Sequence, residues 1–111
     1  PYPIPTPVAQ AALAALSPDG LAAARQAAAD LVAGREPLAA ALARLPFVRR
    51  VWPSDANFLL VSVDDSARLM ALCRAAGLVI RDRSKDVPNT VRITVGSPAE
   101  LDFALAVLAR A

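Results

Sequence analysis

A long helical pattern beginning at Ser17 limits the folds that are open to this chain. Ser17 to Gly20 is typical of a helix start, with serine as the N-cap and proline in the first turn. One buried face is indicated by apolar residues at helical spacing: Leu21, Ala24, Ala28, Leu31, Leu38, Leu42 and Leu45. A continuous helix would span roughly 40 Å, and Pro37 should bend it. We infer that so long a helix also packs against something outside this sequence.

The residues before this helix alternate with proline. The opening PYPIPTP predicts an extended segment, because proline fixes its own backbone and disfavours helix at the residue before it. A short helix should then run from Val8 to Leu16, with Thr6 as its cap and Pro7 as its first residue. So abrupt a beginning predicts a fragment of a longer protein. We expect residues 1–16 to be a segment between domains and residues 17–111 to be a small domain.

Two strands and a helix follow the long helix. Strands are predicted for Phe47–Trp52 and Asn57–Val63, and the second contains the run FLLV, which is apolar on both faces. That run predicts a central strand covered on both sides. Asp64-Asp65-Ser66 should cap the next helix, which ends at Gly77. Its expected core positions are Leu69, Leu72, Cys73 and Ala76.

The stretch GLVIRDRSKDVPNTVRITVGSP, from Gly77 to Pro98, completes the sheet. It predicts a short strand ending in Arg81, a polar loop, and a second strand from Val91 to Val95. A capping box at Ser97–Glu100 then starts a last helix with apolar positions Leu101, Ala104, Leu105 and Leu108. The order of elements predicts an α+β fold, with a small, mostly antiparallel sheet of about four strands covered by helices.

Composition excludes several classes of function. The chain has 111 residues, one cysteine and no histidine, which argues against a metal site, an internal disulfide and a Ser-His or Cys-His pair. Hydrophobic residues make up 56% of the chain without forming an apolar run of membrane length. Basic residues are spread without aromatic neighbours, so nucleic-acid binding has no support. Because we find no signal peptide, we expect a cytoplasmic protein.

Two arginines are the best candidates for a binding site. Alternation along Val91–Val95 sends Arg92 and Thr94 to one face and the three apolar residues to the other. With Arg81 on the neighbouring strand, Arg92 would form a fork of donors suited to a phosphate or carboxylate. The simpler alternatives are an ordinary solvent-facing arginine for Arg92 and a local ion pair with Asp82 for Arg81.

Lys85 is a weaker candidate. A lysine that forms a Schiff base is desolvated, whereas Lys85 lies in a polar loop among Arg83, Ser84 and Asp86. We therefore interpret it as a solvated loop residue. Trp52 and Tyr2 are interpreted as packing residues, and Cys73 as core filler.

At this point the sequence resembles a known family. PYPIPTPVAQAALAALSPDG, the long helix, ANFLLV, GLVIRD and VRITVG stand in the order found in the C-terminal part of histidinol-phosphate aminotransferases. These are fold-type I enzymes that depend on pyridoxal phosphate. The resemblance covers the chain from end to end, and related amino-acid aminotransferases share some of the same pieces.

The resemblance implies the small domain of a two-domain enzyme of histidine biosynthesis. Arg92 matches the strand arginine that binds the carboxylate of glutamate or 2-oxoglutarate and the phosphate of histidinol phosphate, and Arg81 matches a second arginine near the phosphate. The cofactor's lysine and phosphate-binding residues belong to the large domain, so we expect no catalytic, cofactor-binding or metal-binding residue in this chain. Lys85 does not match that lysine. The whole enzyme would be a homodimer.

Two other hypotheses remain at this stage. The chain could be a free-standing α+β module that binds a small anion or dimerises through its sheet, which a gene starting near Pro1 would favour. An RNA-binding ferredoxin-like domain is less favoured because the strands lack aromatic residues for base stacking. We also expect the isolated fragment to be inactive, and its long helix to offer apolar faces for pairing with another copy.

Overall fold

The structure, a computed structural model, describes residues 3–111. Pro1 and Tyr2, which open the expected extended segment, lie outside the described residues. Contacts divide the chain into two compact units, Pro1–Asp30 and Leu31–Ala111, and the division falls inside helix α2 (Pro18–Leu42). This division does not test where the expected small domain begins, so the boundary after residue 16 stays a prediction.

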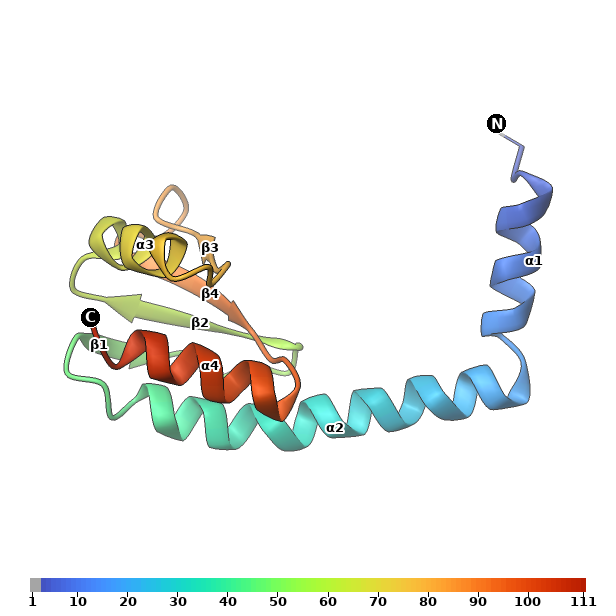
Figure 1. Ribbon diagram of the computed structural model, residues 1–111, viewed down its shortest axis with the longest axis horizontal. Coiled ribbons are helices and arrows are strands. Elements are labelled where there is room, and N and C mark those ends of the chain that lie inside the picture. Colours follow the sequence, from blue (N-terminus) through green and yellow to red (C-terminus); the bar gives the residue numbers. More distant parts are fainter. Residues whose placement is uncertain (1–2) are drawn as a thin grey trace. The chain divides into compact units, whose positions relative to one another are not determined.

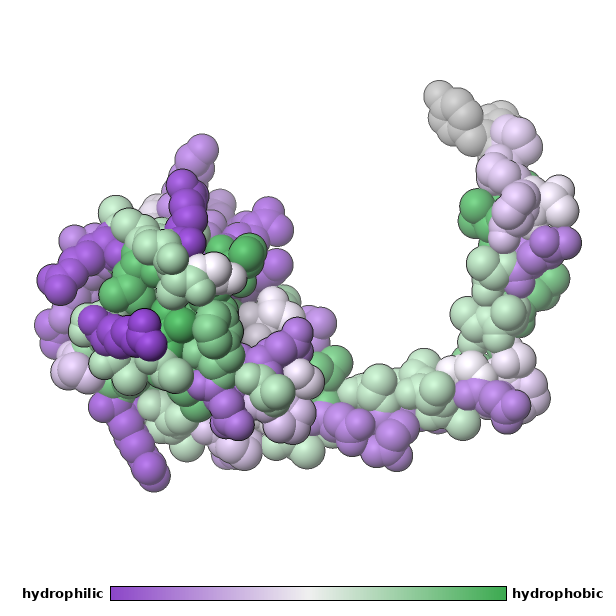
Figure 2. All heavy atoms as spheres, in the orientation of Figure 1, coloured by the Kyte–Doolittle hydropathy of each residue, from purple (hydrophilic) through white to green (hydrophobic). Residues whose placement is uncertain are grey.

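The first unit contains α1 (Thr6–Ala15) and the beginning of α2. The prediction that Thr6 caps α1 is wrong: Pro5 is the N-cap, and Thr6 is already helical. The carbonyl oxygen of Pro5 accepts a hydrogen bond from the amide of Ala9 at 3.0 Å, which closes the first turn. Pro7 fits that turn because its missing N–H would have had no partner there. Large apolar side chains of this unit remain exposed (Figure 2): Ile4, Val8, Leu13, Leu16 and Leu21.

Helix α2 begins as predicted, with the amide of Gly20 donating to Ser17 Oγ at 3.1 Å. It continues through Pro37 as one helix (Figure 1), and the expected bend stays a prediction. Leu38 and Leu42 are buried, with 2% and 1% of their surface exposed. The predicted buried face is wrong at Leu21, Ala24 and Ala28, which are exposed. Those three precede Leu31 and are not members of the core cluster found among residues 3–111.

The sheet has four strands in the order β1-β2-β4-β3, and every neighbouring pair is antiparallel. The strands are β1 (Val48–Val51), β2 (Phe58–Val63), β3 (Arg81–Asp82) and β4 (Thr90–Thr94). The α+β fold predicted from the order of patterns is confirmed. No helix among residues 3–111 is both long enough and apolar enough to cross a membrane.

The core lies on one face of the sheet. Leu59, Val61 and Val63 alternate along β2 with half-buried neighbours, and Val91 and Ile93 of β4 lie on the same face. Helices α2, α3 (Ser66–Ala75) and α4 (Pro98–Leu108) contribute Leu38, Leu42, Leu69, Cys73 and Leu108 to this cluster. β2 is an inner strand, as predicted, but the prediction that both of its faces are covered is wrong. The side chains of Phe58 and Leu60 lie on the face opposite this core, where they are only half-buried.

The segment that follows α3 contains less β-strand than predicted. Gly77 ends α3 with φ 76°, and the amide of Leu78 donates to the carbonyl oxygen of Cys73 at 2.8 Å. This is a Schellman cap, in which the residue after the glycine still bonds to the helix. The predicted strand ending in Arg81 is therefore wrong: β3 starts at Arg81. Leu78 and Ile80 pack against the core instead of pairing with β4.

The capping box predicted for α4 is confirmed. Ser97 Oγ accepts from the amide of Glu100, and Glu100 Oε2 accepts from the amide of Ser97 at 2.7 Å. Ala104 and Leu108 are buried as predicted, whereas Leu101 and Leu105 are half-buried. The resulting helix places Leu108, which has no exposed surface, in the middle of the core.

Replacing Leu108 by alanine tests this core. Leu108→Ala should lower the free energy of unfolding by about 2–5 kcal/mol, because it removes packed methyl groups and leaves a cavity. Leu13→Ala is the matched control, since Leu13 is 72% exposed, and should change stability by less than about 0.5 kcal/mol. Urea unfolding followed by circular dichroism measures both. Equal effects of the two changes would contradict the core described here.

Candidate functional site

One face of the sheet carries the functional candidates. We call it the open face, and its residues alternate along β2 and β4 with the buried ones: Phe58, Leu60, Ser62, Thr90, Arg92 and Thr94. Of these, only Thr90 is fully buried, whereas Val61 and Val91 on the opposite face have 1% and 0% of their surface exposed. The side chains available to a ligand therefore lie on this side of the sheet.

The register of β3 and β4 places Arg81 directly opposite Arg92. Side chains paired in this way lie on the same face with Cβ atoms about 4.5–5.5 Å apart, and like charges in such a pair repel. Arg83, two residues after Arg81, is paired with Asp86, whose Oδ2 is 2.8 Å from Arg83 Nη2. Neither Arg81 nor Arg92 has such a partner within residues 3–111. Two adjacent, uncompensated guanidinium groups would be stabilised by an anion.

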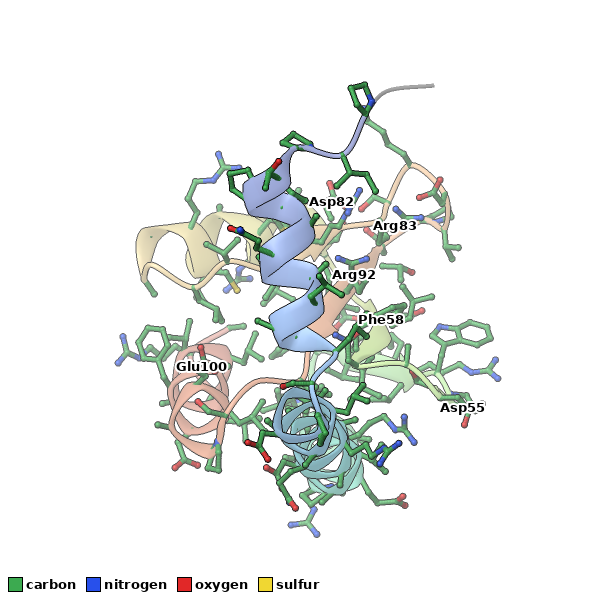
Figure 3. All side chains as sticks on the ribbon, turned by 90° about the vertical axis from the view of Figure 1, so that its right-hand side faces the viewer. Asp55, Phe58, Asp82, Arg83, Arg92 and Glu100 are labelled. Atoms are coloured by element: carbon green, nitrogen blue, oxygen red, sulfur yellow. The ribbon has the colours of Figure 1, made fainter. Side chains whose placement is uncertain are left out.

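Arg92 is held by an aromatic ring rather than by hydrogen bonds. Its Cζ lies 4.9 Å from the centroid of the Phe58 ring (Figure 3), within the range of a cation–π interaction. Its Nε is buried and has no hydrogen-bond partner among the described residues. An unsatisfied buried donor costs about 1–3 kcal/mol, so a hydrogen-bond acceptor at this atom would stabilise the site.

The position of Arg81 depends on the hydrogen bonds that hold the short strand β3 in place. Asp82 Oδ1 accepts hydrogen bonds from the amide of Ser84 at 2.8 Å and from Ser84 Oγ at 2.5 Å. Ser84 Oγ also lies 2.7 Å from Ser66 Oγ, at the start of α3. The hydrogen bonds from Ser84 lower the pKa of Asp82. Asp82 is therefore engaged with Ser84, and the alternative of an ion pair between Arg81 and Asp82 is not realised in the structure.

The other side of the open face has a second stack. Arg50 Cζ lies 3.6 Å from the centroid of the Trp52 ring, and Trp52 Nε1 donates to Ser62 Oγ at 3.1 Å. Thr90 Oγ1 is 3.4 Å from the same serine oxygen. This network joins the end of β1 to β2 and β4.

The remaining candidates do not join the arginine pair. Lys85 is exposed in the loop after β3, as expected from its polar neighbours. Cys73 has no exposed surface, and burial raises the pKa of its thiol, which agrees with its interpretation as core filler. No group of three or more His, Cys, Asp or Glu residues in the described part of the chain could hold a metal ion.

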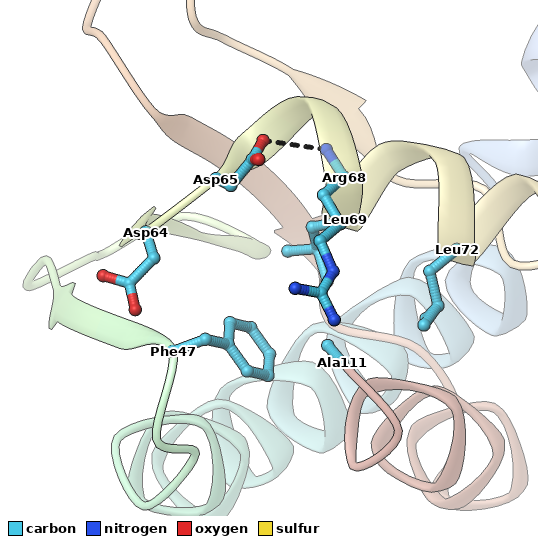
Figure 4. A pocket seen from close by; sticks show the side chains of 7 residues that line it. All are labelled: Phe47, Asp64, Asp65, Arg68, Leu69, Leu72 and Ala111. Atoms are coloured by element: carbon cyan, nitrogen blue, oxygen red, sulfur yellow. Dashed lines mark hydrogen bonds between the residues drawn. The ribbon is translucent and has the colours of Figure 1, made fainter.

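Neither Arg81 nor Arg92 lines the four hollows described in the second unit. A cavity of about 160 Å³ between the start of β1, the start of α3 and the end of the chain (Figure 4) is lined by Phe47, Asp64, Asp65, Arg68, Leu69, Leu72 and Ala111. Asp65 Oδ1 accepts a hydrogen bond from the backbone amide of Arg68 at 2.9 Å, and Asp64 forms an ion pair with Arg49. The carboxylates on this lining disfavour an anion, whereas the open face carries two arginines that no carboxylate pairs with among residues 3–111. The open face is therefore the stronger anion site.

The arrangement can bind an anion but offers no group for covalent chemistry. Sequence reasoning brought Arg81 and Arg92 together correctly, since the two strands pair in register. It did not identify Phe58 as a neighbour of Arg92 and treated it only as an apolar strand position. Alternation alone could not show that Phe58 and Arg92 share a face, because that depends on the register between β2 and β4.

Comparisons with known proteins identify relatives. The model of the family "Aminotransferase class I and II" matches residues 1–108. A histidinol-phosphate aminotransferase of Stenotrophomonas maltophilia (strain R551-3) is 46% identical over 110 residues, covering 97% of this chain and 30% of the relative. That of Aeromonas salmonicida (strain A449) is 44% identical, covering 97% of this chain and 31% of the relative.

A solved structure shows the same fold at low identity. A decarboxylase from Sulfurospirillum multivorans superposes with a TM-score of 0.83, covering 98% of this chain and 32% of that chain. Its sequence identity is 16%, so the likeness concerns the fold alone. The chain spans about 30% of the length of the curated relatives that it matches.

The anchoring of β3 predicts a dependence of stability on pH. Because hydrogen bonds lower the folded pKa of Asp82 below its ordinary value of 3.8, its carboxylate stabilises the fold above that value. This contribution is lost as the pH falls through the folded pKa. As the pH falls below about 3.8, the wild type should therefore lose stability more steeply than Asp82→Asn, in urea unfolding at a series of pH values.

Ser84→Ala provides the matched test of the cause. It removes the Oγ donor to Asp82 and keeps the backbone donor, so it should flatten the acid limb only in part. Identical slopes for the wild type and Asp82→Asn would show that this carboxylate does not anchor β3.

Proposed function

The chain belongs to the class I and II aminotransferases, and on that basis we propose that it is the C-terminal, substrate-binding domain of a histidinol-phosphate aminotransferase. The identity of 46% over 97% of the chain supports this choice within the family. The whole enzyme would convert histidinol phosphate and 2-oxoglutarate to imidazole acetol phosphate and glutamate. The uncompensated pair of Arg81 and Arg92 is the observation that carries the proposal.

We assign Arg92 to the anionic group of each substrate in turn. A guanidinium can donate two parallel hydrogen bonds to a carboxylate or to a phosphate, so one residue suits glutamate and histidinol phosphate alike. Arg81 adds a second positive charge on the same side of the sheet, which favours the phosphate with its higher charge. In this assignment both residues bind and orient the substrate, and neither reacts with the amino group that is transferred.

The family depends on pyridoxal phosphate, and the residues of this chain do not fit that cofactor. Lys85, the only lysine of the sequence, is exposed in a loop and lines none of the hollows found in the second unit. We therefore place the cofactor in the part of the relatives that this chain does not span. Binding of the cofactor and transfer of the amino group would both be carried out there.

The partners follow from the same proposal. The large domain of the enzyme would complete the site above the open face, where the positive charges of Arg81 and Arg92 would bind the anion. The exposed apolar side chains of α1 and the exposed start of α2 would be covered in the whole protein. A homodimer and a cytoplasmic location, both expected from the resemblance, stay predictions.

The isolated chain should bind no pyridoxal phosphate and catalyse no transamination. Mixing it with the cofactor should leave the visible spectrum of free pyridoxal phosphate unchanged, because the chain offers no enclosed lysine. A shifted absorbance band accompanied by turnover of histidinol phosphate would contradict the proposal.

Arg92→Ala in the full-length enzyme should reduce kcat/KM for histidinol phosphate and for glutamate by about tenfold to a hundredfold. The estimate follows from losing one or two charge-assisted hydrogen bonds of about 1.5–3 kcal/mol. Cofactor binding, measured by absorbance, should stay unchanged. Steady-state kinetics of both half-reactions provide the test.

Arg50→Ala is the matched control for this change. Arg50 is also stacked on an aromatic ring of the open face, but β1 lies two strands away from β4. Its replacement should alter kcat/KM by less than about twofold. If Arg92→Ala left both substrates unaffected, Arg92 would not belong to the site and the proposal would lose its main support.

A further inference from the structure

Phe58 and Arg92 meet because of the pairing between β2 and β4. Leu60 lies opposite Arg92 in this ladder, and Phe58 lies opposite Thr94. Phe58 is therefore the diagonal neighbour of Arg92 on the open face, a position that aromatic and long side chains can bridge. The guanidinium lies over the ring, with 4.9 Å between Cζ and the ring centroid (Figure 3).

The ring is the only described partner that fixes the guanidinium. No carboxylate pairs with Arg92, and its Nε is buried without a hydrogen bond among the described residues. A carboxylate in this place would orient the arginine but would also neutralise the charge that an anionic ligand needs. An aromatic face attracts the cation while occupying none of its N–H donors. Phe58 can thus hold Arg92 and leave Nη1 and Nη2 for the ligand.

We propose that Phe58 is a positioning residue of the anion site: its ring sets the plane of the Arg92 guanidinium before the carboxylate or phosphate of the substrate arrives. This inference rests on the proposed function of Arg92. A guanidinium fixed in advance loses less side-chain freedom when the anion binds, so the ring increases affinity without touching the substrate. It also fixes the direction of a two-pronged hydrogen bond, which needs a defined plane.

The test uses the full-length enzyme with Phe58→Leu and Phe58→Tyr. Phe58→Leu keeps an apolar side chain but removes the ring, and it should raise KM for histidinol phosphate about threefold to tenfold with kcat within about twofold. Phe58→Tyr keeps the ring and should restore the wild-type KM. The inhibition constant of inorganic phosphate, used as a probe for the anion site, should rise in Phe58→Leu by the same factor.

Two further variants separate positioning from packing. Phe103→Leu makes the same change at an aromatic residue of α4 that is 49% exposed, and should leave KM unaltered. In an Arg92→Ala background, Phe58→Leu should add no further loss, because the ring acts through Arg92. The melting temperatures of all variants are compared, so that a KM change caused by loss of folded protein is recognised.

Each other outcome has a definite meaning. If Phe58→Leu leaves KM unchanged while Arg92→Ala raises it, the positioning role is overturned and the proposed function stands. The role is also overturned if the KM of Phe58→Tyr is raised like that of Phe58→Leu. It is overturned too if Phe58→Leu lowers kcat/KM further in the Arg92→Ala background, since Phe58 would then act only in packing. If Arg92→Ala itself has no effect, the proposed function fails first.

Discussion

The pairing of β2 with β4 is the constraint on which the other features depend. In this register Val61 lies opposite Val91 and Leu60 lies opposite Arg92. Because successive residues of a strand point to opposite faces, the same ladder places the valines under the helices and Arg92 on the open face. A slip by one residue would exchange these faces, burying a charge and exposing the core. The hydrophobic effect therefore fixes the place of Arg92 as well as that of the core.

The helices and their ends could be predicted from the sequence because their signals are local. Ser17, Asp65 and Ser97 each accept a hydrogen bond from the backbone amide three residues later, as their residue types indicate. The glycine that ends α3 was equally clear. Thr6 failed as a cap because Pro5 and Pro7 already suit a helix start, so the helix needs no side-chain acceptor there.

Features that depend on distant partners were harder to predict. Phe58 and Leu60 are apolar, but they lie on a face of β2 where they are only half-buried. From the sequence alone, such a strand cannot be distinguished from one that is covered on both faces. Leu21 has the spacing of a core residue but finds no core in this chain. Arg81 and Arg92 were predicted to be neighbours, whereas the ring beneath Arg92 follows only from the register. Local patterns predict that residues such as Leu21 and Leu60 are apolar but not which of them the fold of this chain covers.

The Schellman cap of α3 also has a consequence for the solubility of the domain. Leu78 completes the cap and cannot also pair with β4, and β3 has only two residues, so one edge of the sheet is too short to template another strand. The opposite edge, β1, carries Arg49 and Arg50, and charges on an edge strand oppose pairing with a second chain. A sheet that leaves one face open is thereby protected at both margins against edge-to-edge aggregation.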